Sequence, residues 1–211
     1  LLEESFQKYA ARNAYVCMDK YMTYGELDEY SKKLAAWLQS RGMKKGARVA
    51  IMMPNVLQYP IAIAAVLRAG FTVVNVNPLY TPRELEHQLS DSGSEAIIVL
   101  ENFANTLQQV LTKTPVRHII VADMGEMLGF AKGMLDGTVE GYESFIDAVS
   151  SQSPSALADA VEGMDMLYSS GTTGRPKGVE LTHLNFLHLA YNGVTGLAEI
   201  VAPPGARTLL F

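Results

Sequence analysis

Cysteine is almost absent from this 211-residue sequence, which contains one, Cys17. A lone cysteine cannot form an internal disulfide, and no histidine lies near it at the spacing of metal ligands. These facts exclude the small disulfide-stapled domains and the cysteine-based zinc motifs. Cys17 is interpreted as a small core residue of a protein from a reducing compartment.

Long hydrophobic runs are also missing. The longest uninterrupted apolar stretch covers residues 61–67, whereas a membrane-spanning helix needs about 20 apolar residues. No segment that is first charged and then apolar opens the chain, as a signal peptide would. We therefore expect a cytoplasmic protein.

Positive charge is scarce as well. The formal net charge is −5, and no run of basic residues is longer than Lys44 with Lys45. This balance argues against nucleic acid as the main partner. With 48% hydrophobic and 18% charged residues, the chain has the composition of one sizeable folded domain, and it shows no internal repeat.

Two segments carry complete helix signals. Thr23 and Glu26 form a capping-box pattern before a helix predicted to end near Gly42, and apolar residues recur along it at helical spacing. These apolar residues, interpreted as core, are Leu27, Tyr30, Leu34, Trp37 and Leu38. The stretch from Thr81 combines an N-cap, a proline at the first helical position and a capping acid, Glu84. It predicts a helix to about Asp91 that stops at Gly93.

Short apolar runs alternate with helical patterns over the first 122 residues. Strands are predicted at 14–18, 48–53, 71–76, 96–100 and 116–122, and further helices after Pro54 and at 102–111. This alternation predicts an α/β fold, a layered and mostly parallel sheet with flanking helices and right-handed crossovers. Residues 123–163, rich in Gly, Ser and Asp, are interpreted as a surface connecting segment, and residues 164–211 as a return to the same domain.

The most informative stretch is MDMLYSSGTTGRPKGVEL, residues 164–181. Its centre, residues 169–178, holds four hydroxyl side chains, three glycines, an arginine and a lysine. Short donors, close backbone approach at glycine and a mobile ammonium group suit the crowded oxygens of a triphosphate. The flanking apolar segments 164–168 and 179–181 could each form a short strand, so the stretch predicts a phosphate-holding hairpin loop.

Its spacing departs from that of a Walker A loop, because Gly171, Gly174 and Lys177 fall three residues apart. No helix is predicted to start at Lys177, so help from a helix dipole is not implied. The alternative is a hairpin loop with nothing bound. A hairpin turn, however, needs only about two to five residues, which favours a functional loop.

YSSGTTGRPKGV, followed by LTHLN, resembles the phosphate loop of the adenylate-forming acyl-CoA synthetases, and among them the bacterial long-chain fatty-acid–CoA ligases. A second stretch, VLRAGFTVVNVNPLYTPRELEHQLSDSG at residues 66–93, is similar to the segment that precedes this loop in long-chain members. The resemblance covers nearly the whole chain. It implies that the chain is the N-terminal part of such a ligase, with ATP and Mg²⁺ as cofactors and a fatty acid and coenzyme A as substrates.

The resemblance also implies roles for individual residues. The ATP-binding residues would be Ser169, Ser170, Gly171, Thr172, Thr173, Gly174 and Lys177. Lys177 and Thr172 would act in catalysis, and the Ser169 hydroxyl would reach the metal. His183, which follows Thr182 as in the family, is interpreted as a helix-start or packing residue.

Three alternatives and two expectations complete the sequence-based hypothesis. The chain could be a non-catalytic nucleotide-binding module, a structural domain with an empty loop, or a ligase for aryl or other carboxylates.

The family's basic insertion is missing near 123–163, where Lys132 is the single basic residue, so peripheral membrane contact lacks support. The first residue is Leu1, and the apolar run 208–211 ends the sequence. We therefore expect a fragment that can self-associate through this truncated edge.

Overall fold

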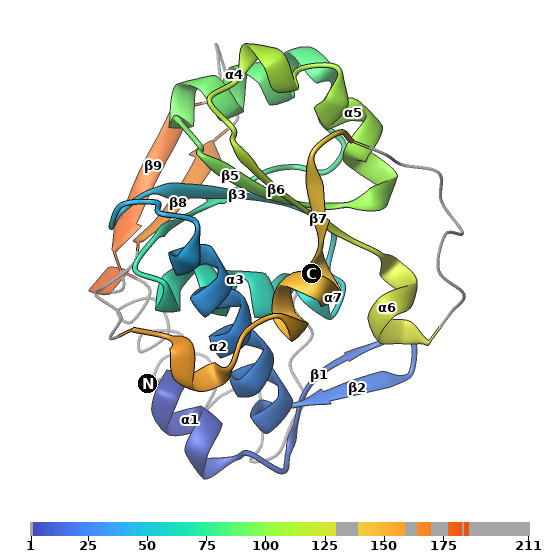
Figure 1. The fold of residues 1–211 in the computed structure, drawn as a ribbon, viewed down its shortest axis with the longest axis vertical. Helices are drawn as coiled ribbons and strands as arrows, with labels where there is room; N and C mark the ends of the chain where they lie inside the picture. The colour runs from blue at the N-terminus through green and yellow to red at the C-terminus, as the bar shows by residue number, and fades with distance from the viewer. Residues whose placement is uncertain (1, 130–138, 159–163, 170–176, 183, 186–211) are drawn as a thin grey trace, which may run out of the picture.

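The computed structural model of the chain describes residues 2–129, 139–158, 164–169, 177–182 and 184–185. A seven-stranded sheet lies at its centre, in the order β7-β6-β5-β3-β4-β8-β9 (Figure 1). Every neighbouring pair is parallel except β8 with β9. The strands are β3 (Arg48–Met52), β4 (Thr72–Asn75), β5 (Ala96–Leu100), β6 (His118–Ala122), β7 (Tyr142–Ser144), β8 (Met164–Ser169) and β9 (Lys177–Thr182). The predicted α/β class with a mostly parallel sheet is confirmed.

Helices cover both faces of this sheet (Figure 1). One face carries α4 and α5, and the opposite face carries α2, α3 and α7. The α-helices are α1 (Leu2–Lys8), α2 (Tyr24–Ser40), α3 (Gln58–Arg68), α4 (Pro82–Ser92), α5 (Ala104–Gln108), α6 (Met124–Leu128) and α7 (Phe145–Ser150). Three 3-10 turns are η1 (Glu101–Phe103), η2 (Leu111–Lys113) and η3 (Pro154–Ala156).

The burial of the central strand β5 explains why the strands appear in the sequence as continuous apolar runs. All five of its residues are buried. Ile97 and Val99 pack in the cluster beneath α4 and α5, and Ile98 and Leu100 pack in the cluster that includes Trp37 of α2. A parallel sheet buried on both faces needs apolar side chains at successive positions, whereas a sheet with one solvated face shows strict alternation.

Both predicted capping boxes are confirmed. At the start of α2, the Glu26 N–H donates to the Thr23 hydroxyl at 3.2 Å, and the Thr23 N–H donates to the Glu26 carboxylate at 2.7 Å. The same reciprocal pair joins Thr81 and Glu84 at the start of α4. That helix ends at Gly93, whose φ of 63° is the left-handed conformation that glycine adopts without strain.

Two local predictions need adjustment. The predicted strand at 14–18 is β1 (Asn13–Cys17), and it pairs antiparallel with a strand that was not predicted, β2 (Lys20–Thr23). The turn between them lies at Met18 and Asp19, which both have positive φ. The helix predicted at 102–111 is broken into η1, α5 and η2, since its tertiary contacts override a weak helical pattern.

The segment 123–163 is not simply a surface connection. Within it, β7 pairs with β6 at the end of the sheet, and Phe145, Ala148 and Val149 of α7 are buried in the core. The Trp37 indole N–H donates to the Glu143 carboxylate at 2.8 Å. The prediction missed this because a strand of three residues is too short to show a period.

A buried guanidinium joins the N-terminal helix to the domain. The Arg68 side chain is 8% exposed and donates to the Glu3 carboxylate at 2.8 Å, to the Ser31 hydroxyl at 2.6 Å and to Asp28. Burial alone raises the pKa of the Asp28 carboxyl. The hydrogen bonds and charges of Lys32 and Arg68 outweigh that effect and hold this pKa below its ordinary value.

We expect Thr23→Ala to destabilise the domain by about 1 kcal/mol, because the substitution removes the oxygen that caps α2. Urea unfolding measures the change. The matched control is Thr23→Ser, which keeps the hydroxyl and should unfold close to the wild-type midpoint. Equal unfolding midpoints for the alanine variant and the wild type would contradict a stabilising cap.

A second prediction follows from the lowered pKa of Asp28. A carboxyl whose pKa is lower in the folded state stabilises the fold above its ordinary pKa of about 3.9. This stabilisation is lost as the pH falls through the folded-state value. Asp28→Asn should therefore unfold more easily than the wild type at pH 7, and the difference should shrink toward pH 3.

Urea unfolding across this pH range tests the prediction. The control is Glu29→Gln, which removes an exposed i,i+4 partner of Lys33 and should have a small effect at every pH. A difference for Asp28→Asn that stays constant with pH would show that the charge of Asp28 does not contribute.

Candidate nucleotide-binding site

The two ends of the predicted phosphate loop are neighbours in space. β8 and β9 pair antiparallel with Ser169 opposite Lys177 and Tyr168 opposite Gly178. Both strands predicted to flank the loop are therefore present, and the pairing extends to the last residue of β8 and the first of β9.

The hairpin is held in the sheet through β8. β8 lies parallel to β4, with Thr72 opposite Met164 and Val74 opposite Met166. Ser169 comes three residues after Met166, so it emerges at the carboxyl ends of the parallel strands. This edge is where ligands bind in open α/β sheets.

The strand order creates a switch point beside the hairpin. The connection that leaves β4 returns through α4 to β5 on the far side of β3, whereas β8 continues outward to β9. Connections that diverge from neighbouring strands leave a crevice between them at their carboxyl ends. The loop that follows Ser169 begins at this crevice.

The structure tests the position of the predicted site and not the contacts of its residues. Ser169 and Lys177 are placed by their backbone pairing. The other predicted ATP-binding residues lie outside the described residues, and they are Ser170, Gly171, Thr172, Thr173 and Gly174. His183 and the run 208–211 also lie outside them. The roles expected for all of these residues stay predictions.

Asn75, the last residue of β4, is a neighbour of the crevice that the sequence reasoning did not single out. Its side-chain oxygen accepts a hydrogen bond from the Tyr59 hydroxyl at 2.8 Å. Its backbone carbonyl accepts one from the Gln88 side-chain amide at 2.8 Å. These bonds tie α3 and α4 to the end of β4. A polar residue directly after an apolar strand was the available signal.

The chain leaves the hairpin through a further cap. The Thr182 N–H donates to the Asn185 side-chain oxygen at 2.8 Å, and the Asn185 N–H donates to the Thr182 hydroxyl at 3.4 Å. This reciprocal pair begins a helical turn at Leu184, as predicted for this position. A half-exposed ion pair of 3.7 Å joins Glu180 of β9 to Arg48 of β3.

The charge near this edge is set by the capping acid of α4, the helix that follows the carboxyl end of β4. The Thr81 hydroxyl and backbone N–H donate to Glu84 and hold the pKa of its carboxyl below the usual range. A permanent negative charge thus compensates the N-terminus of α4. This helix end is therefore poorly suited to bind an anion.

The described residues contain neither a cluster of metal ligands nor a membrane-spanning helix. No group of three or more His, Cys, Asp and Glu side chains could hold a metal ion in the part of the chain that the structure describes. Within the same residues, every helix is too short or too polar to cross a bilayer.

The fold and the hairpin define a doubly covered α/β domain with a glycine- and hydroxyl-rich loop at a switch point. A sequence model of the family described as AMP-binding enzyme matches residues 2–210. The chain therefore belongs to the AMP-binding enzyme family. The resemblance seen in the loop and in residues 66–93 is confirmed.

Individual relatives agree with this assignment. The chain is 46% identical over 207 residues to a long-chain-fatty-acid–CoA ligase of Escherichia coli O157:H7, and 33% identical over 204 residues to one of Bacillus subtilis (strain 168). Each alignment covers 89% of this chain and 36% of the relative. The chain thus spans about a third of the length of the curated relatives that it matches.

Solved structures agree on the fold. A long-chain-fatty-acid–CoA ligase from Archaeoglobus fulgidus matches with a TM-score of 0.74 and 28% identity, over 94% of this chain and 39% of that one. An anthranilate CoA ligase in complex with anthranoyl-AMP matches with a TM-score of 0.79 and 24% identity, over 92% of this chain and 36% of that one. The second likeness supports the fold alone.

Proposed function

We propose that this chain supplies the phosphate-holding part of an ATP-dependent ligase, which activates a long-chain fatty acid to acyl-AMP and then to acyl-CoA. The observation that carries the proposal is the β8–β9 hairpin, which brings Ser169 opposite Lys177 at the carboxyl edge of the sheet. Membership of the AMP-binding family and the relatives that are long-chain ligases support it.

The proposed roles follow from the chemistry of each residue. The glycines and backbone N–H groups of the loop approach the β- and γ-phosphates, and the hydroxyls of Ser170, Thr172 and Thr173 donate to their oxygens. Lys177, at the start of β9, adds a mobile positive charge. Together with Thr172, it would stabilise the charge that moves onto pyrophosphate as it leaves.

Mg²⁺ fits this donor set. Magnesium in nucleotide sites is held largely by phosphate oxygens and water, with few protein ligands. The Ser169 hydroxyl at the end of β8 is our candidate ligand. When bound, the metal ion would neutralise phosphate charge.

The proposed reaction has two steps, formation of acyl-AMP and formation of the thioester. A carboxylate oxygen of the fatty acid attacks the α-phosphorus, the bond to the β-phosphate oxygen breaks, and pyrophosphate leaves with the electron pair. The sulfur of coenzyme A then attacks the acyl carbonyl, the thiol proton passes to a base, and AMP leaves. In this chemistry, the protein contributes mainly by positioning the reactants and neutralising charge.

The fatty acid is proposed from two supports, the relatives that are long-chain ligases and the long-chain-like stretch between Asn75 and Gly93. The test is ATP–pyrophosphate exchange by the complete enzyme with a panel of long-chain, medium-chain and aromatic carboxylates. The proposal requires exchange that depends on long-chain acids. Preference for benzoate or anthranilate would replace the substrate class, and ATP binding without any exchange would make the domain a nucleotide-binding module.

In the complete enzyme, we expect Lys177→Ala to slow adenylation by about tenfold to a hundredfold, because a charge-assisted hydrogen bond contributes about 1.5 to 3 kcal/mol. The melting temperature should barely change, since alanine keeps the backbone pairing of residue 177 with Ser169. Pyrophosphate exchange and thermal melting measure the two effects. Lys45→Ala, at an exposed position, is the control and should leave both unchanged. Normal exchange by a folded Lys177→Ala enzyme would refute the role of Lys177.

We also expect the 211-residue chain by itself to bind ATP weakly and to form neither acyl-AMP nor acyl-CoA. The chain spans 36% of the length of a long-chain ligase that it matches, and we infer that the adenine- and ribose-binding residues and a second catalytic lysine of the complete enzyme lie in the remainder. Without those groups, the α-phosphate is not oriented for attack. Separate assays of acyl-AMP and thioester formation test this. Turnover of either step at the rate of the complete enzyme would place the active site within these residues.

A further inference from the structure

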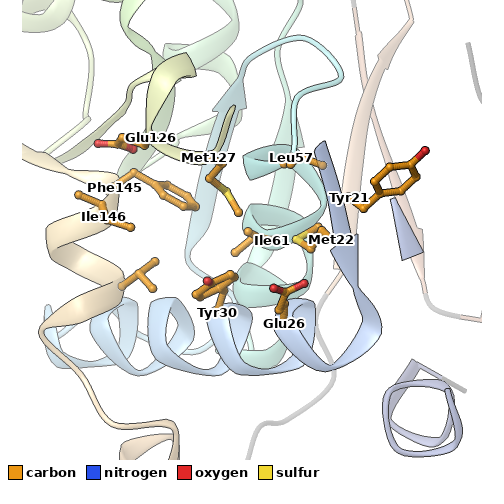
Figure 2. A pocket seen from close by; sticks show the side chains of 11 residues that line it. Tyr21, Met22, Glu26, Tyr30, Leu57, Ile61, Glu126, Met127, Phe145 and Ile146 are labelled. Atoms are coloured by element: carbon orange, nitrogen blue, oxygen red, sulfur yellow. The ribbon is translucent and has the colours of Figure 1, made fainter. Parts of the chain in front are cut away.

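A cavity of about 200 Å³ lies on the face of the sheet opposite to α4 and α5. Side chains from β2, α2, α6 and α7, together with the start of α3, line it (Figure 2). The lining residues are Tyr21, Met22, Glu26, Tyr30, Leu57, Ile61, Glu126, Met127, Phe145, Ile146 and Val149. It is separate from the β8–β9 hairpin, since no residue of β8 or β9 lines it among those described.

The cavity lies near a second switch point of the sheet. The connection from β3 leads through α3 to β4 on one side, whereas the connection from β5 leads to β6 on the other. Lining residues follow the carboxyl ends of strands on both sides of this divide. Leu57 comes after β3, Met127 after β6 and Phe145 after β7. The carboxyl side of such a divide is the usual position of ligand sites in α/β sheets.

Most of the side chains that line the cavity are apolar or aromatic, which suits the binding of an aromatic ring. In Figure 2, Phe145, Met127 and Ile61 point into the space between α7 and α3, with Tyr30 below them on α2. Methionine sulfur and aromatic side chains both make favourable contacts with rings. A dry cavity of about 150 Å³ accommodates benzene. A cavity of about 200 Å³ therefore has room for one aromatic ring with a short alkyl substituent.

The charged lining residues are both carboxylates, Glu26 and Glu126, and no described lining residue is cationic. Glu26 lies beside Tyr30, and Glu126 lies at the opposite side of the apolar group (Figure 2). Both hydrogen bonds that Glu26 accepts from Thr23 reach its Oε2 atom. Its Oε1 atom can therefore accept a donor from a ligand while the cap of α2 stays intact.

We propose that this cavity binds a small primary amine that carries one aromatic ring. The ring fills the space among Ile61, Met127 and Phe145, and the ammonium group donates to Glu26 beside the Tyr30 hydroxyl. Glu126 adds negative potential without direct contact. This ligand has the opposite charge to the carboxylate, phosphate and coenzyme A groups of the proposed reaction, so the cavity is a distinct site.

The lining methionines provide the test. In the full chain with ¹³C-methyl-labelled methionine, a titration with phenethylamine should shift the Met22 and Met127 methyl resonances saturably. The dissociation constant should lie in the millimolar range expected for so small a ligand. The Met53 methyl, buried elsewhere in the core, should not move. Phenylacetate, which has the opposite charge, should leave all three resonances unchanged.

Glutamine variants isolate the role of charge, because glutamine at this position can also complete a capping box. Glu26→Gln should weaken phenethylamine binding about tenfold, as expected for the loss of a hydrogen bond to a charged group. Glu126→Gln should weaken it about twofold to threefold, since its field is partly screened. Glu84→Gln changes the matching capping acid of α4 and should bind like the wild type.

Four results would overturn the proposal. These are no methyl shift with phenethylamine up to about 10 mM, equal binding of uncharged phenethyl alcohol, wild-type binding by Glu26→Gln, or shifts that spare Met22 and Met127. Since the assay reports on cavity methyl groups and not on turnover, its failure would leave the ligase proposal unaffected. A failure of pyrophosphate exchange would likewise leave this proposal in place.

Discussion

Burial of the parallel sheet on both faces is the constraint on which the rest of this structure depends. β5 has no exposed residue, and its side chains enter two separate cores. A polar group on either face needs a partner, because a buried polar group without one is costly. Ligand binding is favoured at the carboxyl edge, where the strands end and the loops begin. The carboxyl edge holds the hairpin, the end of β4 and the cavity beneath β3.

Helix capping determines where along that edge anions or cations are attracted. Thr23 with Glu26, Thr81 with Glu84 and Asp123 with Glu126 form the same reciprocal cap at the starts of α2, α4 and α6. Each pair places a carboxylate at a helix N-terminus and compensates its positive dipole. These helix ends are thus poor sites for anions. A phosphate site near them must be built from loop donors and a cation. Hydroxyl residues, glycines and Arg175 make up most of the segment between β8 and β9, and Lys177 begins β9.

The same capping acids make the second switch point suitable for cations. Glu26 and Glu126 stabilise their helices and also line the apolar cavity. The two proposals thus assign sites of opposite preference to one sheet edge. They assign phosphate to the hairpin at the end of β8 and an amine to the cavity below β3. Under these proposals, residues that stabilise helices also contribute to ligand selectivity.

The sequence by itself determined the features that depend on neighbours in the chain. The bounds of α2 and α4 follow from bonds between residues three apart and from Gly93. The alternation of short apolar runs with helical patterns indicated a mostly parallel sheet with flanking helices. Only the tertiary structure decided the strand order, the pairing of β7 with β6, and the position of β8 beside β4, where Val73 lies opposite Asp165. It also assembled the cavity from five elements. Contacts between residues so far apart depend on how whole faces pack together, and no local pattern in the chain encodes that packing.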